Sequence, residues 1–593
     1  MTDAANKLAL IRSALKQHNI DAYIITLSDP HLQENVPEHW NIVRWLTGFS
    51  GSAAVVAITN SSAIFWTDSR YLIQAENELE GSLFEIIKPL AFRRRDYTDW
   101  LDENLPQGST IGFDGKIVSV DLFRRLSKRL GYKNITFLDK IDLISGLWYN
   151  RPSIPNSEAW EHTSGYSGSE RSEKIAGVRE IMQSKNINLH LLTSPDDIMW
   201  MLNLRGNDLM YSPVLISYAL TDVDRILFFV DQNKISESIS NKLELSGVKI
   251  LPYEELSAHL ESYNEELSVL VTPSATSVAV YNSIPSCLKI VEGDSIPSLL
   301  KSKKNKTEIQ NIGKIMIIDG IALTRFFFYL ENNFGSVSMS ERSLAEKLLE
   351  FRSLNEDFIK PSFATITAFN EHAALPHYRA TPGSDMELTG SGIFLVDSGG
   401  HYVGGTTDIT RTISLGIPAE RQKTDFTLVL KGHIRLARTK FPSGTKGYQL
   451  DILAREALWK AGLDYGHGTG HGVGYCLNVH EGPQSITPSV NRTSIEAGML
   501  ITNEPAVYRN GEYGIRTENL MLCYEDEETE FGRFLKFDTF SLCYIDKSLI
   551  DKLLLDKDEI EWLNNYHCDV YEKLSPHLTD NEKKWLREKT EEI

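Results

Sequence analysis

The residues that first suggest chemistry are two carboxylates on either side of a glycine-rich turn. An apolar run ends on Asp397, glycines follow, and a threonine-rich run carries Asp408. Apolar and β-branched residues around a glycine turn are typical of a β-hairpin. With the turn centred at residues 402–403, Asp397 and Asp408 would face each other with Cα atoms about 4.5–5.5 Å apart. Carboxylates that close repel each other unless a proton or a cation lies between them, although an exposed acidic hairpin tip also fits the pattern.

A second hairpin candidate brings two more carboxylates. Residues 499–504 are typical of a strand that ends on Glu504, and a strong Asn-Gly turn signal ends at Gly511. Glu504 and Glu518 are equidistant from Gly511, so a turn centred there would place them opposite one another. Arg516 precedes Glu518 by two residues and therefore shares its strand face.

Two histidines lie between the hairpins, on a segment in which every second residue from Gly466 to Gly474 is glycine. This glycine content disfavours a helix. In an extended chain, His467 and His471 would share one face, and the glycines would let another backbone or a ligand approach closely. A glycine-rich loop with incidental histidines is the alternative.

Four carboxylates with one imidazole form an oxygen-rich donor set. Such a set suits Mn²⁺, and it also fits Zn²⁺ or Co²⁺. The set exceeds what one catalytic ion usually needs, which favours two ions that share bridging carboxylates. A pair of ions about 3.5–4 Å apart generates hydroxide near neutral pH and polarises a carbonyl group.

The whole chain limits the class of protein. Its 593 residues are too many for one core and predict two to four domains. The net charge of −19 argues against a nucleic-acid-binding surface. We expect neither a signal peptide nor a membrane span, because no apolar stretch is long enough. Five scattered cysteines without a C-x-x-C pattern fit a reduced cytosolic protein without a thiolate zinc site.

Two α/β domains are predicted in the first half, at residues 1–150 and 151–306. They resemble each other, because HNIDAYIITLSDP at 18–30 aligns without a gap with KNINLHLLTSPDD at 185–197. Prolines at 150–155 predict an extended linker between them. In the first domain we expect strands at residues 20–27, 52–58 and 62–66 and a helix at 71–80.

The third predicted domain, residues 307–540, contains all the residues named above as candidates for chemistry, and it opens with a helix at 307–330. The remaining tail, residues 541–593, has helical spacing of apolar residues and a capping-box pattern at Thr579 and Glu582. We expect this tail to pack on the third domain without taking part in chemistry.

The order and spacing of five of these residues resemble the metal ligands of a known superfamily. Asp397, Asp408, His471, Glu504 and Glu518 look like the ligand set of the methionine aminopeptidase/prolidase/creatinase proteins with the pita-bread fold. The motifs VDSGGHYVGGTTDITRT, HGTGHGVG, HEGP, TNEP and GIRTEN resemble those of the X-prolyl aminopeptidase branch. Creatinase shares the fold without needing metal, but this chain has all five ligand types.

The resemblance covers nearly the whole chain and implies an architecture. The long, cytosolic form of this branch has two creatinase-like α/β domains before a pita-bread catalytic domain, an α/β and α+β combination. It also implies a homodimer formed largely through the catalytic domain. From the net charge and the lack of a long apolar stretch, we expect no nucleic-acid or membrane partner.

The resemblance also implies roles for individual residues. Asp397 and Asp408 would bind one metal ion, Asp408 and Glu518 would bridge to the second, and His471 and Glu504 would complete the ligand set of the second ion. Glu504 would also take the proton from the bridging water. The resemblance further assigns substrate and proton-transfer roles to His377, His467 and His480, and a buttressing role to Arg516.

Three functions stay open at this point. The first is a dimetal aminopeptidase that releases the first residue when the second is proline. The second is a prolidase that cleaves only Xaa-Pro dipeptides, which usually has one N-terminal domain. The third is a non-catalytic binding protein on the same fold, which the intact ligand set disfavours. Other hydrolase and nucleotide-binding signatures, H-E-x-x-H, G-x-S-x-G and G-x-G-x-x-G after a strand, are missing.

Overall fold

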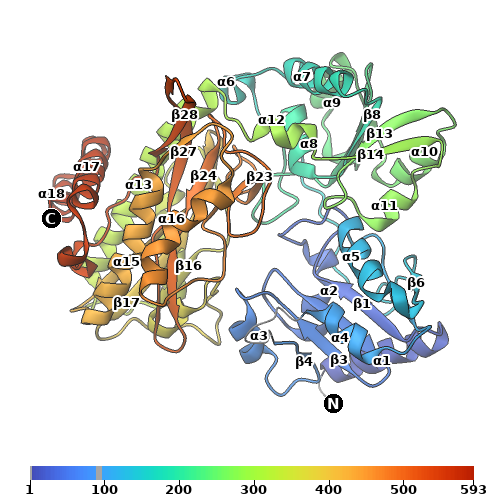
Figure 1. Cartoon of the computed structure of the whole chain (residues 1–593), viewed down its shortest axis with the longest axis horizontal. Helices are drawn as coiled ribbons and strands as arrows, with labels where there is room; N and C mark the ends of the chain where they lie inside the picture. Colours follow the sequence, from blue (N-terminus) through green and yellow to red (C-terminus); the bar gives the residue numbers. More distant parts are fainter. Residues whose placement is uncertain (1–2, 89–95) are drawn as a thin grey trace. The chain divides into compact units, whose positions relative to one another are not determined.

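The structure is a computed structural model that describes residues 3–88 and 96–593. The chain divides into two compact units, and Figure 1 shows its helices and strands. The first unit comprises residues 1–162 and 169–297, and the second comprises residues 163–168 and 298–593. The three predicted domain boundaries stay predictions, since compactness alone separates only these two units.

The first unit contains two six-stranded mixed sheets with the same strand order. The first sheet has the order β4-β3-β2-β1-β5-β6 and the second has the order β12-β11-β10-β8-β13-β14. In both sheets the central strand pairs antiparallel with one neighbour and parallel with the other. The strands of the first sheet are β1 (Ala22–Thr26), β2 (Val55–Thr59), β3 (Ala63–Trp66), β4 (Glu85–Ile86), β5 (Thr110–Phe113) and β6 (Thr136–Leu138). Those of the second are β8 (Leu189–Leu192), β10 (Ser217–Thr221), β11 (Ile226–Val230), β12 (Val248–Leu251), β13 (Leu267–Val271) and β14 (Leu288–Glu292).

The predicted repeat is confirmed by these two sheets. The central strands β1 and β8 occupy the aligned sequence stretches, and each follows a helix, α1 (Asp3–Gln17) or α7 (Arg171–Ser184). Asn19 and Asn186, which are equivalent in the alignment, both have positive φ angles, 54° and 53°. Asparagine is one of the few residues that adopts this left-handed conformation readily. The two domains therefore share both topology and a local turn.

The other expected elements of the first unit are also present. The helix predicted at 71–80 is α3 (Leu72–Glu78). Residues 151–159 have no regular secondary structure, as the prolines of the linker predict. Helices α4 (Tyr97–Asn104), α5 (Val120–Leu130), α8 (Pro195–Leu202), α9 (Glu237–Leu245) and α10 (Leu256–Glu261) complete the two α/β layers.

The second unit is an α+β structure that opens with the long helix α13 (Lys306–Asn333). Asn305 and Glu308 form the capping box at its start. Helices α14 (Glu341–Arg352), α15 (Glu420–Ala437) and α16 (Gly447–Lys460) follow. A three-stranded sheet has the order β16-β17-β20, with β16 (Ile366–Phe369), β17 (Gly392–Ser398) and β20 (Ile409–Leu415). A six-stranded sheet has the order β21-β28-β27-β24-β22-β23, with β21 (Lys440–Pro442), β22 (Gly470–Gly472), β23 (Glu481–Ile486), β24 (Leu500–Asn503), β27 (Asn519–Thr529) and β28 (Gly532–Thr539).

Two smaller sheets belong to the same unit. β15 (Phe358–Pro361), β18 (Gly400–Tyr402) and β19 (Gly405–Thr406) form one, and β25 (Ala506–Arg509) and β26 (Tyr513–Arg516) form another. One large core joins α13, β17 and β20, with Phe326, Phe394 and Ile413 among its buried residues. The hairpins that carry the carboxylates therefore rest on a rigid, packed layer.

The C-terminal tail is helical, as predicted. It forms α17 (Lys557–Leu574) and α18 (Asp580–Thr590), and Thr579 and Glu582 form the predicted capping box. Buried residues on both helices, including Leu563, Val570 and Leu586, belong to the same core as α13. The tail is thus an integral layer of the second unit.

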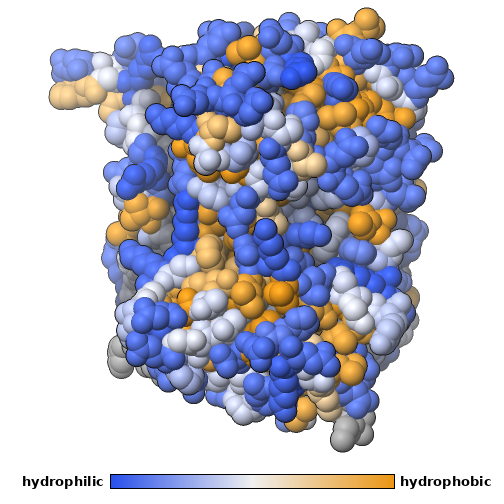
Figure 2. Space-filling model, turned by 90° about the vertical axis from the view of Figure 1, so that its right-hand side faces the viewer, coloured by the Kyte–Doolittle hydropathy of each residue, from blue (hydrophilic) through white to orange (hydrophobic). Residues whose placement is uncertain are grey.

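The surface drawn in Figure 2 is mostly hydrophilic, with apolar side chains gathered in smaller patches. Apolar atoms normally contribute more than half of a folded protein's surface, so such patches are ordinary. Among the described helices, none has the length and apolar content needed to cross a membrane. All five cysteines are free thiols.

Candidate metal centre

The first acidic hairpin forms, but its predicted register is wrong. Asp397 pairs with Thr410, and Tyr402 pairs with Gly405, so the turn lies one residue later than the sequence suggests. The reason is Tyr402, whose ring is fully buried and whose hydroxyl donates to Asp319 at 2.7 Å. That packing holds Tyr402 in a strand and leaves the turn to the next two residues. The shift is two residues in register, so Asp397 and Asp408 are diagonal neighbours on the same face rather than direct partners.

The second hairpin has the predicted register. Asn503 pairs with Asn519 and Ala506 pairs with Arg516, which places Glu504 and Glu518 opposite one another between two ladders. Gly511 lies in the turn with a φ of 72°, where glycine is favoured. Arg509 pairs with Tyr513, so residues 510–512 form a three-residue loop centred on Gly511, as the prediction assumes.

The glycine-rich segment is extended at its centre, where β22 carries His471. A Cβ atom on Gly470 would lie 2.0 Å from the carbonyl oxygen of Thr502, so the two backbones approach as closely as the glycine pattern predicts. The His471 amide also donates to the Thr502 hydroxyl at 3.0 Å. This contact aligns β22 with the strand that ends at Glu504.

All five predicted ligands come together, and His480 joins them. Three overlapping groups have candidate ligand atoms within 4.8 Å of one another: Asp397 with Asp408 and Glu518, His471 with Glu504 and Glu518, and Asp408 with His471 and His480. Asp408 and Glu518 each belong to two groups. This is the arrangement that two cations sharing bridging carboxylates would require.

Burial raises the pKa values of all four carboxyl groups, and neighbouring negative charges raise them further. Burial is the main cause in each case, and it raises the pKa of Asp408 to about 7. The pKa of Glu518 is raised well above its usual value, first by burial and then by the neighbouring charges of Asp408, Glu504 and Asp397. The pKa values of Asp397 and Glu504 are raised for the same reasons. Ionised carboxylates crowded in this way call for positive charge.

The donor chemistry of the site fits divalent cations. Asp397 Oδ1 is buried and has no hydrogen-bond partner, while its other oxygen accepts from Arg516. A buried carboxylate oxygen without a donor is costly unless a cation binds it. The oxygen-rich set with imidazole suits Mn²⁺, Zn²⁺ or Co²⁺, as the sequence predicts.

Arg516 lies behind the carboxylates and contacts several of their neighbours. Besides Asp397, it donates from Nε to the Thr410 hydroxyl at 3.0 Å and from Nη1 to the Tyr508 hydroxyl at 2.6 Å. The Thr410 hydroxyl in turn donates to Glu518 at 2.7 Å. Sequence reasoning missed Thr410 and Tyr508, although both lie an even number of residues from Asp408 and Glu504 and so fit the two-residue strand period.

The predicted histidines differ in how close they come to the carboxylates. His467 Nδ1 lies 3.7 Å from Glu504 Oε2, and His467 Nε2 lies 2.9 Å from the Tyr508 hydroxyl. The His480 ring is exposed and meets the His471 ring edge-on, with 4.4 Å between centroids. His377 is half-buried in the loop after the short helix η5 (Asn370–Ala374), and its role stays a prediction.

The residue after His480 belongs to a buried charged cluster that sequence reasoning missed. Glu481 accepts from Lys301 Nζ at 2.9 Å and from Lys304 Nζ at 2.7 Å, and the three side chains are at most 3% exposed. The lysines hold the pKa of Glu481 below its usual value despite burial. Lysine is almost never fully buried unless it is paired, so a lysine-rich stretch such as residues 301–306 ordinarily indicates an exposed segment. The partner of these lysines lies about 180 residues away in sequence, so no local signal reveals it.

Family models match four consecutive parts of the chain. Residues 310–525 match metallopeptidase family M24, and residues 533–593 match the C-terminal region of peptidase M24. Residues 7–145 and 150–308 match two models of the creatinase/prolidase N-terminal domain. The second unit therefore contains the metallopeptidase match, and the creatinase-like prediction for the two repeated domains is confirmed.

Relatives of known name match over nearly the full length. Xaa-Pro aminopeptidase 1 of Dictyostelium discoideum is 35% identical over 604 residues, which cover 98% of this chain and 96% of that protein. The crystal structure of X-prolyl aminopeptidase from Caenorhabditis elegans, described as a cytosolic enzyme with a di-nuclear active site, matches with a TM-score of 0.95 and 35% identity over 100% of both chains. The Xaa-Pro dipeptidase of Bacillus anthracis, at 23% identity and a TM-score of 0.50, covers 63% of this chain and shares the fold alone.

Proposed function

Because this chain belongs to metallopeptidase family M24, we propose that it is an Xaa-Pro aminopeptidase, a metal-dependent exopeptidase that releases the first residue of peptides with proline second. The observation that carries this conclusion is the full-length match to Xaa-Pro aminopeptidases, which includes both N-terminal domains. The dipeptidase matches only part of the chain. The complete ligand set disfavours a non-catalytic binding protein.

The carboxylates and His471 would hold two divalent cations. Asp397 would bind one ion, His471 and Glu504 the other, and Asp408 and Glu518 would bridge them, in agreement with the three overlapping groups. Two ions bound there would lower the pKa of a water molecule and polarise the carbonyl of the scissile bond. Mn²⁺ is our proposal for the ions, because the donor set is mostly carboxylate.

The residues around the ions would do the rest of the work. Glu504 would accept the proton of the attacking water, since it lies beside His471 and Glu518 in the site and burial raises its pKa. Arg516 would keep Asp397 in place through its hydrogen bond. The free α-amine of the substrate would be attracted to the acidic site, which would limit the enzyme to removing one residue.

The substrate preference follows from the chemistry of an Xaa-Pro bond. This bond has no N–H and a fixed ring, so a protease that binds the backbone N–H on the leaving side cannot use it. The leaving imide nitrogen needs a proton, and imidazole titrates near the working pH. We assign the orientation of the substrate carbonyls and the transfer of this proton to His377, His467 and His480. Of these, His480 has the exposed ring that a substrate can reach.

Comparison of three peptides tests the function. Xaa-Pro-Yaa should lose its first residue, Xaa-Ala-Yaa should be cut slowly, and an Xaa-Pro dipeptide should not be the preferred substrate. A chelator should abolish turnover and Mn²⁺ should restore it. Equal rates for the proline and alanine peptides would contradict the assignment, and so would full activity of metal-free protein. His480→Ala should lose turnover while two ions still bind, which separates its role from that of a ligand.

Assembly, location and domain boundaries are part of the same proposal. We propose a homodimer formed mainly through the catalytic domain, located in the cytoplasm, with peptides as partners and without nucleic-acid or membrane binding. The segments would be residues 1–150, 151–306, 307–540 and 541–593. Sedimentation showing a monomer at micromolar concentration would contradict the dimer.

A further inference from the structure

The glycine-rich segment, residues 466–474, carries His467 on a backbone that its own sequence does not hold in one conformation. Glycine loses more conformational freedom on folding than any other residue, so a chain with glycine at alternate positions does not hold its shape by itself. The short strand β22 begins only at Gly470. His467 precedes that strand, yet its ring must lie within reach of Glu504. Something outside the segment must therefore fix the backbone around His467.

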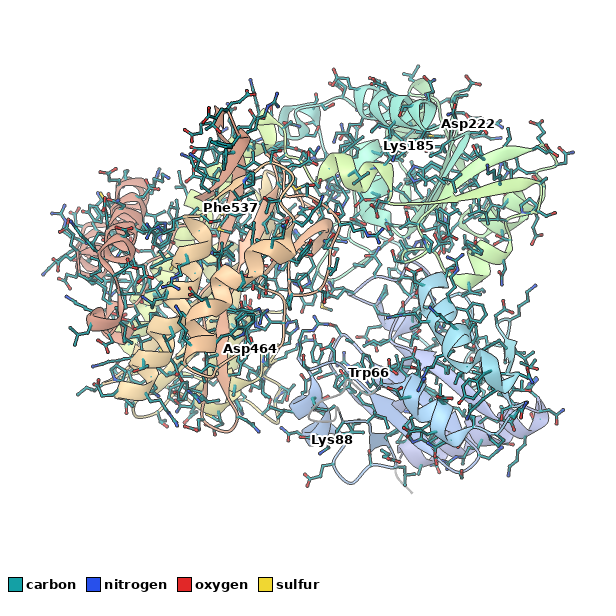
Figure 3. The ribbon with its side chains drawn as sticks, viewed as in Figure 1. Trp66, Lys88, Lys185, Asp222, Asp464 and Phe537 are labelled. Carbon is teal, nitrogen blue, oxygen red and sulfur yellow. The ribbon has the colours of Figure 1, made fainter. Side chains whose placement is uncertain are left out.

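Arg455 on α16 makes the contacts that fix it. The side chain is fully buried, and its three nitrogens donate to four groups. Nε donates to Asp451 at 2.7 Å, and Nη1 donates to Asp464 Oδ1 at 2.8 Å and to the Tyr465 carbonyl at 2.7 Å. Nη2 donates to the His467 carbonyl at 2.7 Å. Figure 3 labels Asp464, which lies on the segment that follows α16.

Asp451, one helical turn before Arg455, holds the other end of the same segment. Its second oxygen accepts from the Thr469 hydroxyl at 2.6 Å. The carbonyl of Thr469 accepts from the backbone amide of Glu504 at 2.8 Å. One pair of side chains on one helix thus contacts the backbone at His467 and, through Thr469, the backbone at Glu504.

The energetics argue that this pair serves more than stability. Burying an ion pair is expensive, and replacing one by apolar residues of similar volume is often neutral or stabilising. What an arginine offers instead is direction, because its planar fork presents five donors in fixed geometry. Here the guanidinium donates to two backbone carbonyl groups, those of Tyr465 and His467. The Tyr465 ring also lies against the guanidinium, with 3.8 Å between the ring centroid and Cζ, which closes the fork from one side.

We propose that Asp451 and Arg455 are positioning residues that set the spacing between His467 and Glu504, and thereby the affinity of the cation site to which Glu504 contributes. This inference rests on the proposed metal-dependent function. Neither residue touches the substrate or the ions. Both act on the backbone of the residues that do.

Arg455→Lys is the primary test, since it keeps the charge and removes the fork. Outer-shell partners of metal ligands typically contribute 10–100-fold in metal affinity or activity. We therefore expect Mn²⁺ binding to metal-free protein, followed by the electron paramagnetic resonance of free Mn²⁺, to weaken about 10–100-fold at one of two sites. The matched control is Arg435→Lys. Arg435 lies on α15 and pairs with Glu456, a neighbour of Arg455 on α16, and with Glu559, and neither partner is on the glycine-rich segment. The control should bind Mn²⁺ like the parent.

Thr469→Val provides a second test that leaves Arg455 in place. It removes the hydroxyl that contacts Asp451 and the Tyr465 hydroxyl, so it should also weaken one Mn²⁺ site. This variant tests the proposal even if Arg455→Lys does not fold. The double variant should lose less than the sum of the two single losses, because both act through one network. Parent-like Mn²⁺ affinity in folded Arg455→Lys, or in Thr469→Val, would overturn the proposal. A parent that binds two Mn²⁺ ions but cleaves no Xaa-Pro-Yaa would refute the function and leave the binding comparison valid.

Discussion

Removal of the Glu481 carboxylate should destabilise the second unit more than any surface charge change. In the parent, the carboxylate lies between two buried ammonium groups, 2.9 Å from Lys301 Nζ and 2.7 Å from Lys304 Nζ. Glu481→Gln keeps the volume but removes the negative charge that both buried ammonium groups contact. Loss of that charge makes the charged form of each buried lysine less favourable, which costs free energy.

The expected magnitude follows from the burial of the three groups. Breaking a buried ion pair by removing one partner costs about 3–5 kcal/mol. The second unit has about 300 residues, which at about 2.1 cal/mol/K per residue gives an unfolding entropy of roughly 0.6 kcal/mol/K. A loss of about 3–5 kcal/mol therefore lowers the Tm of this unit by about 5–8 °C.

Differential scanning calorimetry of three variants distinguishes this reasoning from a general effect of charge. Asp558→Asn is the matched control, because Asp558 pairs with Arg438 at 2.7 Å but is 66% exposed. Screening by solvent limits the contribution of that pair to at most about 1 kcal/mol. Replacement of all three cluster residues, Lys301→Met, Lys304→Met and Glu481→Leu together, should restore a Tm close to that of the parent, since no charge is left unpaired. A Tm of Glu481→Gln within 2 °C of the parent, or a triple variant as unstable as the single one, would refute the argument.

Three further predictions concern the ligands, a glycine contact and a buried acid. Asp408→Asn removes charge from two of the ligand groups, so Mn²⁺ binding and turnover should each fall at least about 100-fold while circular dichroism stays unchanged. Gly470→Ala would place a Cβ atom 2.0 Å from the Thr502 carbonyl oxygen and should cost about 1–3 kcal/mol in denaturant titration, whereas Gly313→Ala, with open space around it, should be neutral or stabilising. Burial raises the pKa of Asp29 to about 7, so the native state binds more protons than the unfolded state between about pH 4 and pH 7, and stability falls as pH rises through that window. The Tm advantage of the parent over Asp29→Asn should accordingly be larger at pH 5 than at pH 7.5.

Local patterns in the sequence predict the hairpins, while long-range packing decides their details. The second hairpin has the predicted register because a three-residue loop centred on Gly511 joins its strands, at the place of the Asn-Gly signal. The first hairpin is displaced because Tyr402 donates to Asp319, a residue 83 positions away on another element. A turn signal cannot contain that information. Thr410 and Tyr508 follow the strand period but belong to residue types too common for a metal centre to be inferred from them.

The contacts that complete the site are the least predictable from sequence. Arg455 reads as an ordinary helical arginine until the structure shows the carbonyl groups at Tyr465 and His467 against it. Lysines 301 and 304 read as exposed, because their partner Glu481 is distant in sequence. The five ligands are recognised from their order and spacing only through resemblance, since hairpin patterns alone allow an acidic tip.

The sequence separation of the two hairpins determines at which stage of synthesis and folding the metal site is complete. Asp397 and Asp408 belong to one hairpin, but the contacts that join them to the other, from Arg516 to Asp397 and from Thr410 to Glu518, span 119 and 108 residues. During synthesis the first hairpin leaves the ribosome long before its partner, and contacts of such sequence separation form late. A chain that ends before Glu504 offers incoming cations only a partial site. A ligand that binds only the native state stabilises it. Cation binding would therefore follow the pairing of the two hairpins and stabilise their contact.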